Sequence, residues 1–180
     1  MNYFKIVSGV LKGKHIFVPE SKRYDQVRPL TKKETDSIFL IAQSNSGSLK
    51  SLDLFSGSGL FNFDIYSSGI KKIHAIDINK YAIKITHKNI TSLHLMNKIY
   101  ISVKNSVKML RHMCKYQHSY NILLIDPPYD IKFRHSFWKS IIYILDKSSI
   151  IIYRDKEQQK EKDVIDEFPH VEKDILFFNL

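Results

Sequence analysis

Residues 49–59 read LKSLDLFSGSG, and this stretch decides the fold. Residues 49–55 predict a strand, and Gly57 and Gly59 allow the backbone after it to turn tightly into a helix that reaches about Ser68. From here to the end of the chain, apolar runs alternate with helical patterns, which predicts βαβ units, a mainly parallel sheet and helices on both faces. Because crossover connections are right-handed, a doubly wound α/β fold is the economical arrangement.

The remaining elements of this domain, which we place over residues 48–180, follow in regular order. A chain of 180 residues fits one such domain with a short appendage. Further strands are predicted at residues 72–76, 99–103, 121–125, 149–153 and 173–178, and helices at about 79–90, 106–114 and 135–145. Asn79 is a plausible cap for the first of these helices.

A small N-terminal appendage is predicted ahead of the domain, over residues 1–47. Residues 1–20 hold two apolar stretches around a turn with two glycines, which is typical of a β-hairpin. Thr31 and Glu34 form the capping-box pattern Thr-Lys-Lys-Glu, so a short helix is expected over roughly 32–43. The polar segment after this helix is the clearest linker, and we place the domain boundary there.

The fourth strand of the domain ends in Asp126-Pro127-Pro128-Tyr129. Proline lacks an amide hydrogen and cannot extend a central strand ladder, so the strand stops here and a stiff loop follows. The loop offers a carboxylate, two carbonyl oxygens free of strand pairing and an aromatic ring, which together suit a planar base that carries an exocyclic amine. The alternative is an ordinary turn, because proline and aspartate are common turn residues.

Polar residues also follow the neighbouring strands. Asp53 precedes the Gly-x-Gly turn, and its carboxylate could meet the ammonium group of a zwitterionic ligand. Asp77 ends the second strand, where an acid commonly accepts hydrogen bonds from ribose hydroxyls. Asn105 and Ser106 follow the third strand, placed to meet an adenine edge. Ligands bind at this edge of doubly wound sheets, so the residues predict one site, although each alone could be a helix cap or a turn.

Composition argues against several other classes of protein. Hydrophobic residues make up 43% of the chain, which is enough for a core, and no apolar run is long enough to span a membrane. The N-terminus lacks the layout of a signal peptide. Cys114 is the only cysteine, so no internal disulfide can form, which fits a cytoplasmic protein. The eight histidines lack ligand-like spacing, and we expect no metal site.

The net charge of +10 is distributed unevenly along the chain. Residues 1–33 carry eight Lys/Arg against two acids, and residues 71–118 carry ten against one acid. Residues 154–174 reverse the sign, with five basic and eight acidic side chains. This asymmetry predicts a basic face for a polyanion, most simply a nucleic acid. The alternative is that lysine merely fills the surface.

Together these motifs resemble those of a known enzyme family. The chain is similar to class I S-adenosylmethionine-dependent methyltransferases, and within them to the bacterial 16S rRNA guanine-N(2) methyltransferases of the RsmD type. Residues 6–14 resemble the opening hairpin of that family, and Arg28-Pro29-Leu30-Thr31 resembles its Arg-Pro-Thr segment. The domain motifs that carry the resemblance are at residues 53–59, 75–79, 88–90 and 126–129.

The resemblance implies a Rossmann-like fold and methyl transfer from S-adenosylmethionine to the exocyclic amine, N(2), of a guanine. It also implies a cytoplasmic monomer whose partner is 16S rRNA, free or within the small ribosomal subunit. The target guanine would be received by Asp126, Pro127, Pro128 and Tyr129. The donor would be held by Asp53, Phe55, Gly57, Gly59, Asp77, Ile78, Asn105 and Ser106. RNA would be bound by Lys12, Lys14, Arg28, Lys32 and Lys33.

Three alternative functions remain open at this point. A DNA adenine-N(6) methyltransferase would share the loop and the donor, but this chain has no insertion large enough for a DNA target-recognition domain. A catalytically inactive nucleic-acid-binding module is compatible with two departures from the family, Asn105 in place of the usual acid and Asn62 in place of a helix glycine. A nicotinamide oxidoreductase is less favoured, because Asn62 stands where a dinucleotide motif would have its third glycine.

Overall fold

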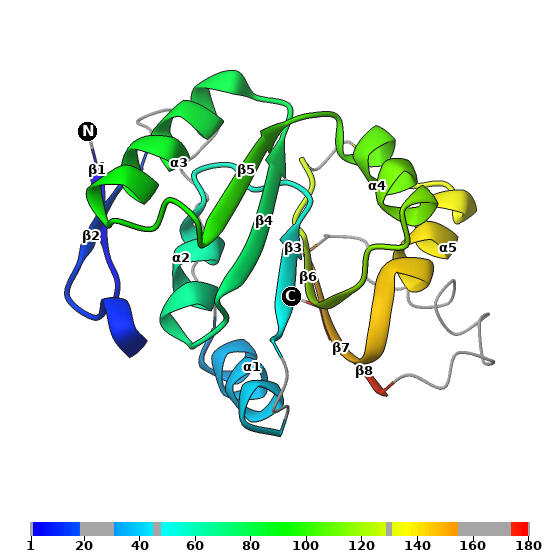
Figure 1. Ribbon diagram of the computed structural model, residues 1–180, viewed down its shortest axis with the longest axis horizontal. Helices are drawn as coiled ribbons and strands as arrows, with labels where there is room; N and C mark the ends of the chain where they lie inside the picture. Colours follow the sequence, from blue (N-terminus) through cyan, green and yellow to red (C-terminus); the bar gives the residue numbers. More distant parts are fainter. Residues whose placement is uncertain (1, 19–30, 45–47, 129–130, 155–173, 180) are drawn as a thin grey trace.

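The computed structural model describes residues 2–18, 31–44, 48–128, 131–154 and 174–179. These residues form a six-stranded sheet with helices on both faces and a separate two-stranded hairpin (Figure 1). The predicted doubly wound α/β fold is therefore confirmed. The strands of the main sheet are β3 (Lys50–Asp53), β4 (Lys72–Asp77), β5 (Ile99–Val103), β6 (Tyr120–Ile125), β7 (Leu145–Tyr153) and β8 (Asp174–Asn179).

The main sheet has the strand order β5-β4-β3-β6-β7-β8. Every pairing between these described strands is parallel. Parallel neighbours need crossover connections, and in the described part of the chain the helices between successive strands from β3 to β7 supply them. The chain builds outward from β3 to β5 and then returns to the other side of β3 with β6, so the strand order reverses between β3 and β6.

Two apolar cores lie on opposite faces of this sheet. Successive side chains of a strand point to opposite faces, so Ile122 and Leu124 of β6 pack in one core while Leu123 and Ile125 pack in the other. The first core is covered by α1 (Lys32–Ser44), α2 (Leu60–Ser67) and α3 (Lys80–Ser92). The second is covered by α4 (Ser106–Lys115) and α5 (His135–Ile144).

Most predicted element bounds agree with the structure to within one or two residues, and one differs by more. The first strand ends at Asp53 rather than at residue 55, because the Asp53 carboxylate accepts a hydrogen bond from the Phe55 amide and the chain turns there. The strand predicted at 149–153 begins at Leu145, directly after α5. Leu145 already has extended backbone angles and pairs with Tyr120, so no connecting loop is needed.

The N-terminal hairpin consists of β1 (Asn2–Lys5) and β2 (His15–Val18), with a short 3-10 turn, η1 (Gly9–Leu11), between them. It is fastened to two helices of the main domain. The Leu11 amide donates to the Ser67 hydroxyl at the end of α2 (3.0 Å). The Asn89 amide group of α3 binds both the amide (2.8 Å) and the carbonyl (2.9 Å) of Phe17. Ile16 and other hairpin residues share the first core, so this part of the predicted appendage packs directly on the sheet domain.

Helix α1 begins with the predicted capping box. The Thr31 amide donates to the Glu34 carboxylate (2.6 Å), and the Glu34 amide donates to the Thr31 hydroxyl (3.2 Å). Ile38 of the same helix is fully buried in the first core. The domain boundary after residue 47 stays a prediction, since the linker itself lies outside the described residues.

Candidate active site

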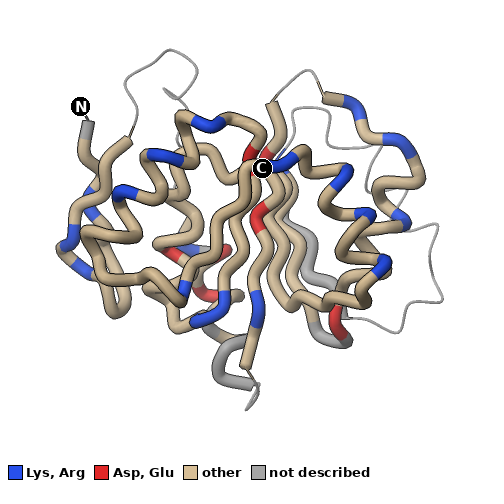
Figure 2. Tube along the Cα trace, turned by 45° about the horizontal axis from the view of Figure 1, so that its top comes forward, with Lys and Arg blue, Asp and Glu red and all other residues tan. Residues whose placement is uncertain are grey.

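The candidate site lies where the strand order reverses, at the carboxyl ends of β3, β4 and β6. Asp53 ends β3, Asp77 ends β4 and Asp126 follows β6. The charges of Asp77 and Asp126 both raise the pKa of the Asp53 carboxyl group, so the three acids lie close to one another. In Figure 2, acidic positions meet near the centre of the sheet, while Lys and Arg positions are spread over the surrounding elements.

Asp53 is completely buried, and its carboxyl group is bound from within the protein. One oxygen accepts from the Phe55 amide (3.1 Å) and the other from the Asn62 side chain (2.8 Å). Burial raises the pKa of Asp53 to about 8, with smaller contributions from the neighbouring acids. The sequence suggested that this carboxylate could meet an ammonium group of a ligand, and the structure shows an amide of the protein in contact with it. Asn62 therefore has a structural role at the position where a dinucleotide motif has glycine.

The two glycines of the turn have different surroundings. Gly57 has a φ of +48°, and a side chain there would meet no atom within 4 Å, so this part of the turn faces open space. Gly59 has a φ of +79°, but a Cβ atom there would lie 2.7 Å from the Thr86 methyl group of α3. Gly57 thus leaves room above the turn, whereas Gly59 permits close packing between the turn and α3.

Asp77 fixes the turn from the neighbouring strand. Its carboxylate accepts hydrogen bonds from the amides of Gly57 and Asn79, both at 2.7 Å. Ile78, directly after it, is 69% exposed although it is apolar. A half-buried carboxylate beside an exposed apolar side chain suits a ligand that combines hydroxyl groups with a flat apolar ring.

Asn105 and Ser106 mark the start of α4. The Asn105 side chain caps this helix by accepting a hydrogen bond from the Lys108 amide (3.1 Å), so the helix-cap role suggested by the sequence is confirmed. Asn105 is nevertheless exposed, which leaves its side chain accessible to a ligand. The buried Ser106 hydroxyl donates to the carbonyl of Leu54, which ties α4 to the exit of β3.

An aromatic cluster lies beside the exit of β3. Phe55 packs against Phe133, with ring centroids 5.8 Å apart. Phe133 stacks on Phe137 at 3.9 Å with nearly parallel rings, and it makes a T-shaped contact with Trp138. Phe55 was predicted from the sequence, whereas Phe133 follows the Asp126-Pro127-Pro128-Tyr129 motif in a segment without a periodic pattern and was not.

The predicted target loop is described as far as Pro128, and Tyr129 lies outside the described residues. Pro127 is buried and Pro128 is exposed, and the Pro128 carbonyl accepts a hydrogen bond from the Ile131 amide (3.1 Å). The Asp126 side chain keeps 22% of its surface exposed, so its carboxylate reaches the solvent at this edge.

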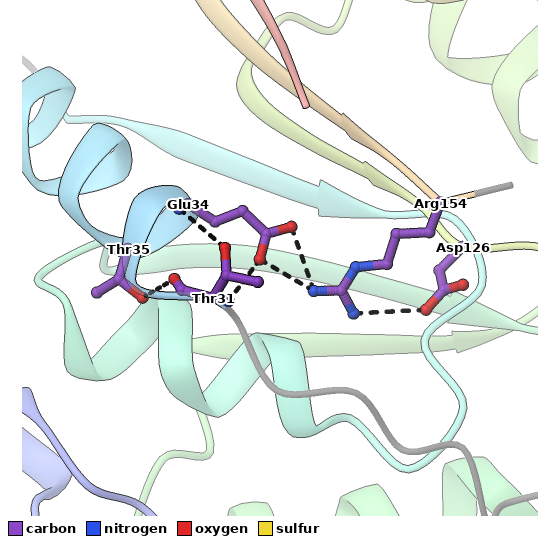
Figure 3. A network of polar contacts seen from close by, with 5 residues as sticks. All are labelled: Thr31, Glu34, Thr35, Asp126 and Arg154. Carbon is purple, nitrogen blue, oxygen red and sulfur yellow. Dashed lines mark hydrogen bonds and ion pairs between the residues drawn. The ribbon is translucent and has the colours of Figure 1, made fainter. Parts of the chain in front are cut away.

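Arg154 is a second residue of the site that was not predicted from the sequence. It directly follows β7, and its amide donates to the Ile125 carbonyl (3.0 Å), which places it beside Asp126. One guanidinium nitrogen lies 3.6 Å from the Asp126 carboxylate. Another lies 3.2 Å from the Glu34 carboxylate of α1 (Figure 3). The sequence pattern that could have indicated Arg154 is an arginine directly after an apolar strand, at the same strand end as Asp126.

The residues predicted to bind RNA are only partly described. Lys12, Lys14 and Lys32 are exposed, whereas Arg28 and the side chain of Lys33 lie outside the described part of the chain. The η1 turn beside Lys12 packs on the last turn of α2, and α2 begins at the glycine turn. An eight-residue helix is roughly 12 Å long, so Lys12 and the candidate site lie toward opposite ends of α2.

The described residues contain no group of three His, Cys, Asp or Glu side chains that could hold a metal ion. Among the described helices, none is long and apolar enough to cross a membrane.

Comparisons with known proteins agree with this architecture. A model of the family described as Conserved hypothetical protein 95 matches residues 4–175. The chain is 28% identical over 165 residues to the Ribosomal RNA small subunit methyltransferase D of Buchnera aphidicola. That match covers 89% of this chain and 80% of its relative.

Solved structures share the fold at lower identity. A SAM dependent methyltransferase from Agrobacterium tumefaciens has a TM-score of 0.63 at 19% identity, covering 76% of this chain and 47% of that one. A hypothetical protein from Thermus thermophilus has a TM-score of 0.63 at 16% identity, covering 81% and 82%. The fold is the Rossmann-like class I methyltransferase fold that the motifs predicted. Because the family model spans nearly the whole chain, the protein belongs to the Conserved hypothetical protein 95 family, the RsmD family of methyltransferases.

Proposed function

We propose that this protein transfers a methyl group from S-adenosylmethionine to the exocyclic N(2) amine of a guanine in 16S rRNA. The observation that carries the proposal is the position of Asp126. Its partly exposed carboxylate stands at the end of β6, one strand from a glycine turn that faces open space. The relative from Buchnera aphidicola, named for small-subunit rRNA, supports the same substrate class. We further propose that the enzyme acts in the cytoplasm as a monomer.

The residues around the turn fit the donor. The open space at Gly57 would accept the methionine part, and the Asp77 carboxylate would accept hydrogen bonds from the ribose hydroxyls. The exposed side chain of Ile78 would cover one face of the adenine, and the Asn105 amide would meet its edge. Asp53, being buried and bound to Asn62, would act by holding the turn in shape.

The chemistry requires alignment more than a strong base. A guanine amine is a weak nucleophile because its lone pair is delocalised into the ring. Asp126 and the Pro127 carbonyl would accept the two amine hydrogens and turn the lone pair toward the methyl group. Alignment of this kind can lower a barrier by roughly 7 kcal/mol or more.

The proposed transfer is a nucleophilic displacement at the methyl carbon of S-adenosylmethionine. The amine nitrogen forms a bond to the methyl carbon, the carbon–sulfur bond breaks, and its electron pair stays on sulfur. The positive charge passes from sulfur to nitrogen, which then releases one proton to water. S-adenosylhomocysteine is left as the second product, and S-adenosylmethionine supplies the only activated group needed.

The proposal is tested by Asp126→Asn, assayed with labelled S-adenosylmethionine on 16S rRNA, small ribosomal subunits and duplex DNA. We expect the variant to bind the donor normally and to lose methylation of RNA by about 10²-fold or more. Asp36→Asn, which removes an exposed acid of α1, is the matched control and should retain full activity.

Each alternative function has its own outcome in this assay. Methylation of DNA in preference to RNA would favour the adenine methyltransferase. Failure of the unaltered protein to bind S-adenosylmethionine in calorimetry would favour the inactive nucleic-acid-binding module. Full activity of Asp126→Asn would contradict the role given to this carboxylate.

A further inference from the structure

We propose that Arg154 is a positioning residue that holds the Asp126 carboxylate in the orientation needed for methyl transfer, and that Glu34 fixes Arg154 in turn. This inference rests on the proposed function, because it assigns Asp126 to the target amine. It extends that function by including a residue of α1, which lies 120 positions away from Arg154 in the sequence.

The three side chains form a continuous polar network from the start of α1 to the residue after β6 (Figure 3). One guanidinium nitrogen of Arg154 contacts both oxygens of Glu34, at 3.3 and 3.2 Å. A second nitrogen lies 3.6 Å from one oxygen of Asp126. The planar guanidinium fork therefore faces two carboxylates in different directions, which a compact lysine ammonium group cannot do in the same way.

The three side chains of this network differ in burial, as expected if two buried residues support one exposed functional group. The side chains of Arg154 and Glu34 are each only 1% exposed, whereas that of Asp126 is 22% exposed. A buried charge is costly unless it is paired, so Arg154 and Glu34 hold each other in place. Asp126 is the member of the network that remains accessible to a bound base.

Glu34 is itself fixed by the capping box of α1. Its carboxylate accepts a hydrogen bond from the Thr31 amide (2.6 Å), and its own amide donates to the Thr31 hydroxyl. The start of α1 is thus connected through Glu34 and Arg154 to the carboxylate at the end of β6. Supporting contacts of this kind allow a reacting group to be held to within a fraction of an ångström.

Arg154 could instead serve only to stabilise the fold, and the two roles predict different measurements. A structural role predicts that activity follows the folded fraction of the protein. A positioning role predicts a slower methyl-transfer step in protein that is fully folded and binds donor and RNA normally. It also predicts a displaced Asp126 side chain when Arg154 is replaced.

The test compares Arg154→Met, Arg154→Lys and Glu34→Gln with Ile150→Ala, all in the full chain. Ile150 is fully buried in β7, the strand that Arg154 follows, so its truncation destabilises the fold and leaves the polar groups of Asp126, Arg154 and Glu34 unchanged. Single-turnover methyl transfer is measured with saturating S-adenosylmethionine and RNA, at a temperature where circular dichroism shows each variant folded. Donor and RNA affinities are measured separately, and crystal structures locate the Asp126 side chain.

We expect Arg154→Met to slow the single-turnover rate by about 10²-fold, with donor and RNA affinities nearly unchanged. Arg154→Lys and Glu34→Gln should be slowed less, and Ile150→Ala should keep the unaltered rate. The Asp126 side chain should move in the Arg154→Met crystal and stay in place in the Ile150→Ala crystal. The inference is overturned if Asp126 keeps its position in Arg154→Met, or if that variant transfers methyl groups at the unaltered rate.

The crystal structures also separate this inference from the proposed function. If the unaltered protein methylates none of the substrates, the proposed function fails, whereas the position of Asp126 in the two variants still decides whether Arg154 holds it. If Arg154→Met does not fold, Glu34→Gln takes its place in the comparison with Ile150→Ala. This substitution weakens the contact that fixes Arg154 and keeps the positive charge of Arg154.

Discussion

Three aspartates stand at the carboxyl ends of three neighbouring strands, and their surroundings give them different capacities. Asp53 is buried and bound to Asn62, so it shapes the glycine turn. Asp77 binds two backbone amides but remains half-exposed, so it can also meet a ligand. Asp126 faces a buried arginine and reaches the solvent. The same side chain thus serves as a support, a ligand contact or a reacting group according to its neighbours.

Asp53→Asn should become more stable relative to the unaltered protein as the pH rises from about 4 to about 8. Burial raises the Asp53 pKa from 3.8 to about 8, so the folded chain keeps a proton that the unfolded chain releases. The stability of the unaltered protein therefore falls with rising pH in this window, and asparagine, which does not titrate, removes that pH dependence. Urea unfolding of both proteins across the window measures the difference, and a difference that does not change with pH would contradict the assignment.

Gly59→Ala should destabilise the protein more than Gly57→Ala. Both substitutions place a side chain at positive φ, but only at Gly59 would the new Cβ meet Thr86, at 2.7 Å. We expect the two free energies of unfolding to differ by about 1–3 kcal/mol, the usual range for overpacking. Adding Thr86→Ala should recover part of the loss in Gly59→Ala, and no recovery would locate the strain elsewhere.

Gly57→Ala should affect donor binding more than stability, because its new methyl group would project into the open space above the turn. We expect weaker binding of S-adenosylmethionine with only a modest loss of stability, measured by calorimetry and by thermal unfolding. Unchanged donor affinity in a folded Gly57→Ala protein would show that the donor does not occupy this space.

Among the elements, the N-terminal hairpin depends on a few polar contacts with the helices beneath it. Asn89 of α3 is fully buried and satisfies both the amide and the carbonyl of Phe17. Ser67 of α2 accepts from the Leu11 amide and donates to the Ser8 carbonyl. The hairpin therefore has its own strand ladder but takes its position from the main domain.

Asn89→Ala should loosen the hairpin and leave the main sheet intact. Two backbone groups of Phe17 would lose their partner, at a cost of about 1–3 kcal/mol for each group left buried. Hydrogen exchange should become faster in β1 and β2 and remain unchanged in β6. Asn97→Ala, at an exposed position, is the control, and equal exchange rates in the two variants would argue against a fastening role for Asn89.

The sequence was most informative where a local pattern determines an element. The alternation of strands and helices, the capping box at Thr31 and the cap at Asn79 all depend on residues close together in the chain, and the structure confirms them. Contacts between distant segments were not predictable in this way. Arg154 meets Glu34 across 120 positions, and neither residue carries a local signal of that pairing. The contact between Asn62 and Asp53 was also not predicted, because Asn62 was considered only as a replacement for the third glycine of a dinucleotide motif.

At the scale of the whole molecule, exposed lysines lie at both ends of the parallel strands, one group at the carboxyl ends and another at the amino ends. Lys80, Lys104 and Lys108 follow the carboxyl ends of β4 and β5, and the Lys104 amide donates to the Asp77 carbonyl (3.0 Å). A second group of lysines lies at the amino ends of the same sheet, where Lys50 pairs with Lys72. The six residues of β4 span roughly 17 Å, which separates the two groups by more than a Debye length at physiological salt.

RNA that delivers a guanine to Asp126 must approach the carboxyl edge, so the two groups of lysines should contribute unequally to binding. We compare two triple variants with the same change in net charge, Lys80→Gln/Lys104→Gln/Lys108→Gln and Lys50→Gln/Lys72→Gln/Lys98→Gln, all at exposed positions. The first should reduce the slope of log affinity against log salt by about 2, since each lost phosphate contact removes about 0.7–0.9. The second should bind RNA nearly as tightly as the unaltered protein, because its lysines lie at the edge opposite the site. Equal losses in the two variants would mean that the lysines act only through net charge, and a larger loss in the second would place the RNA on the opposite edge.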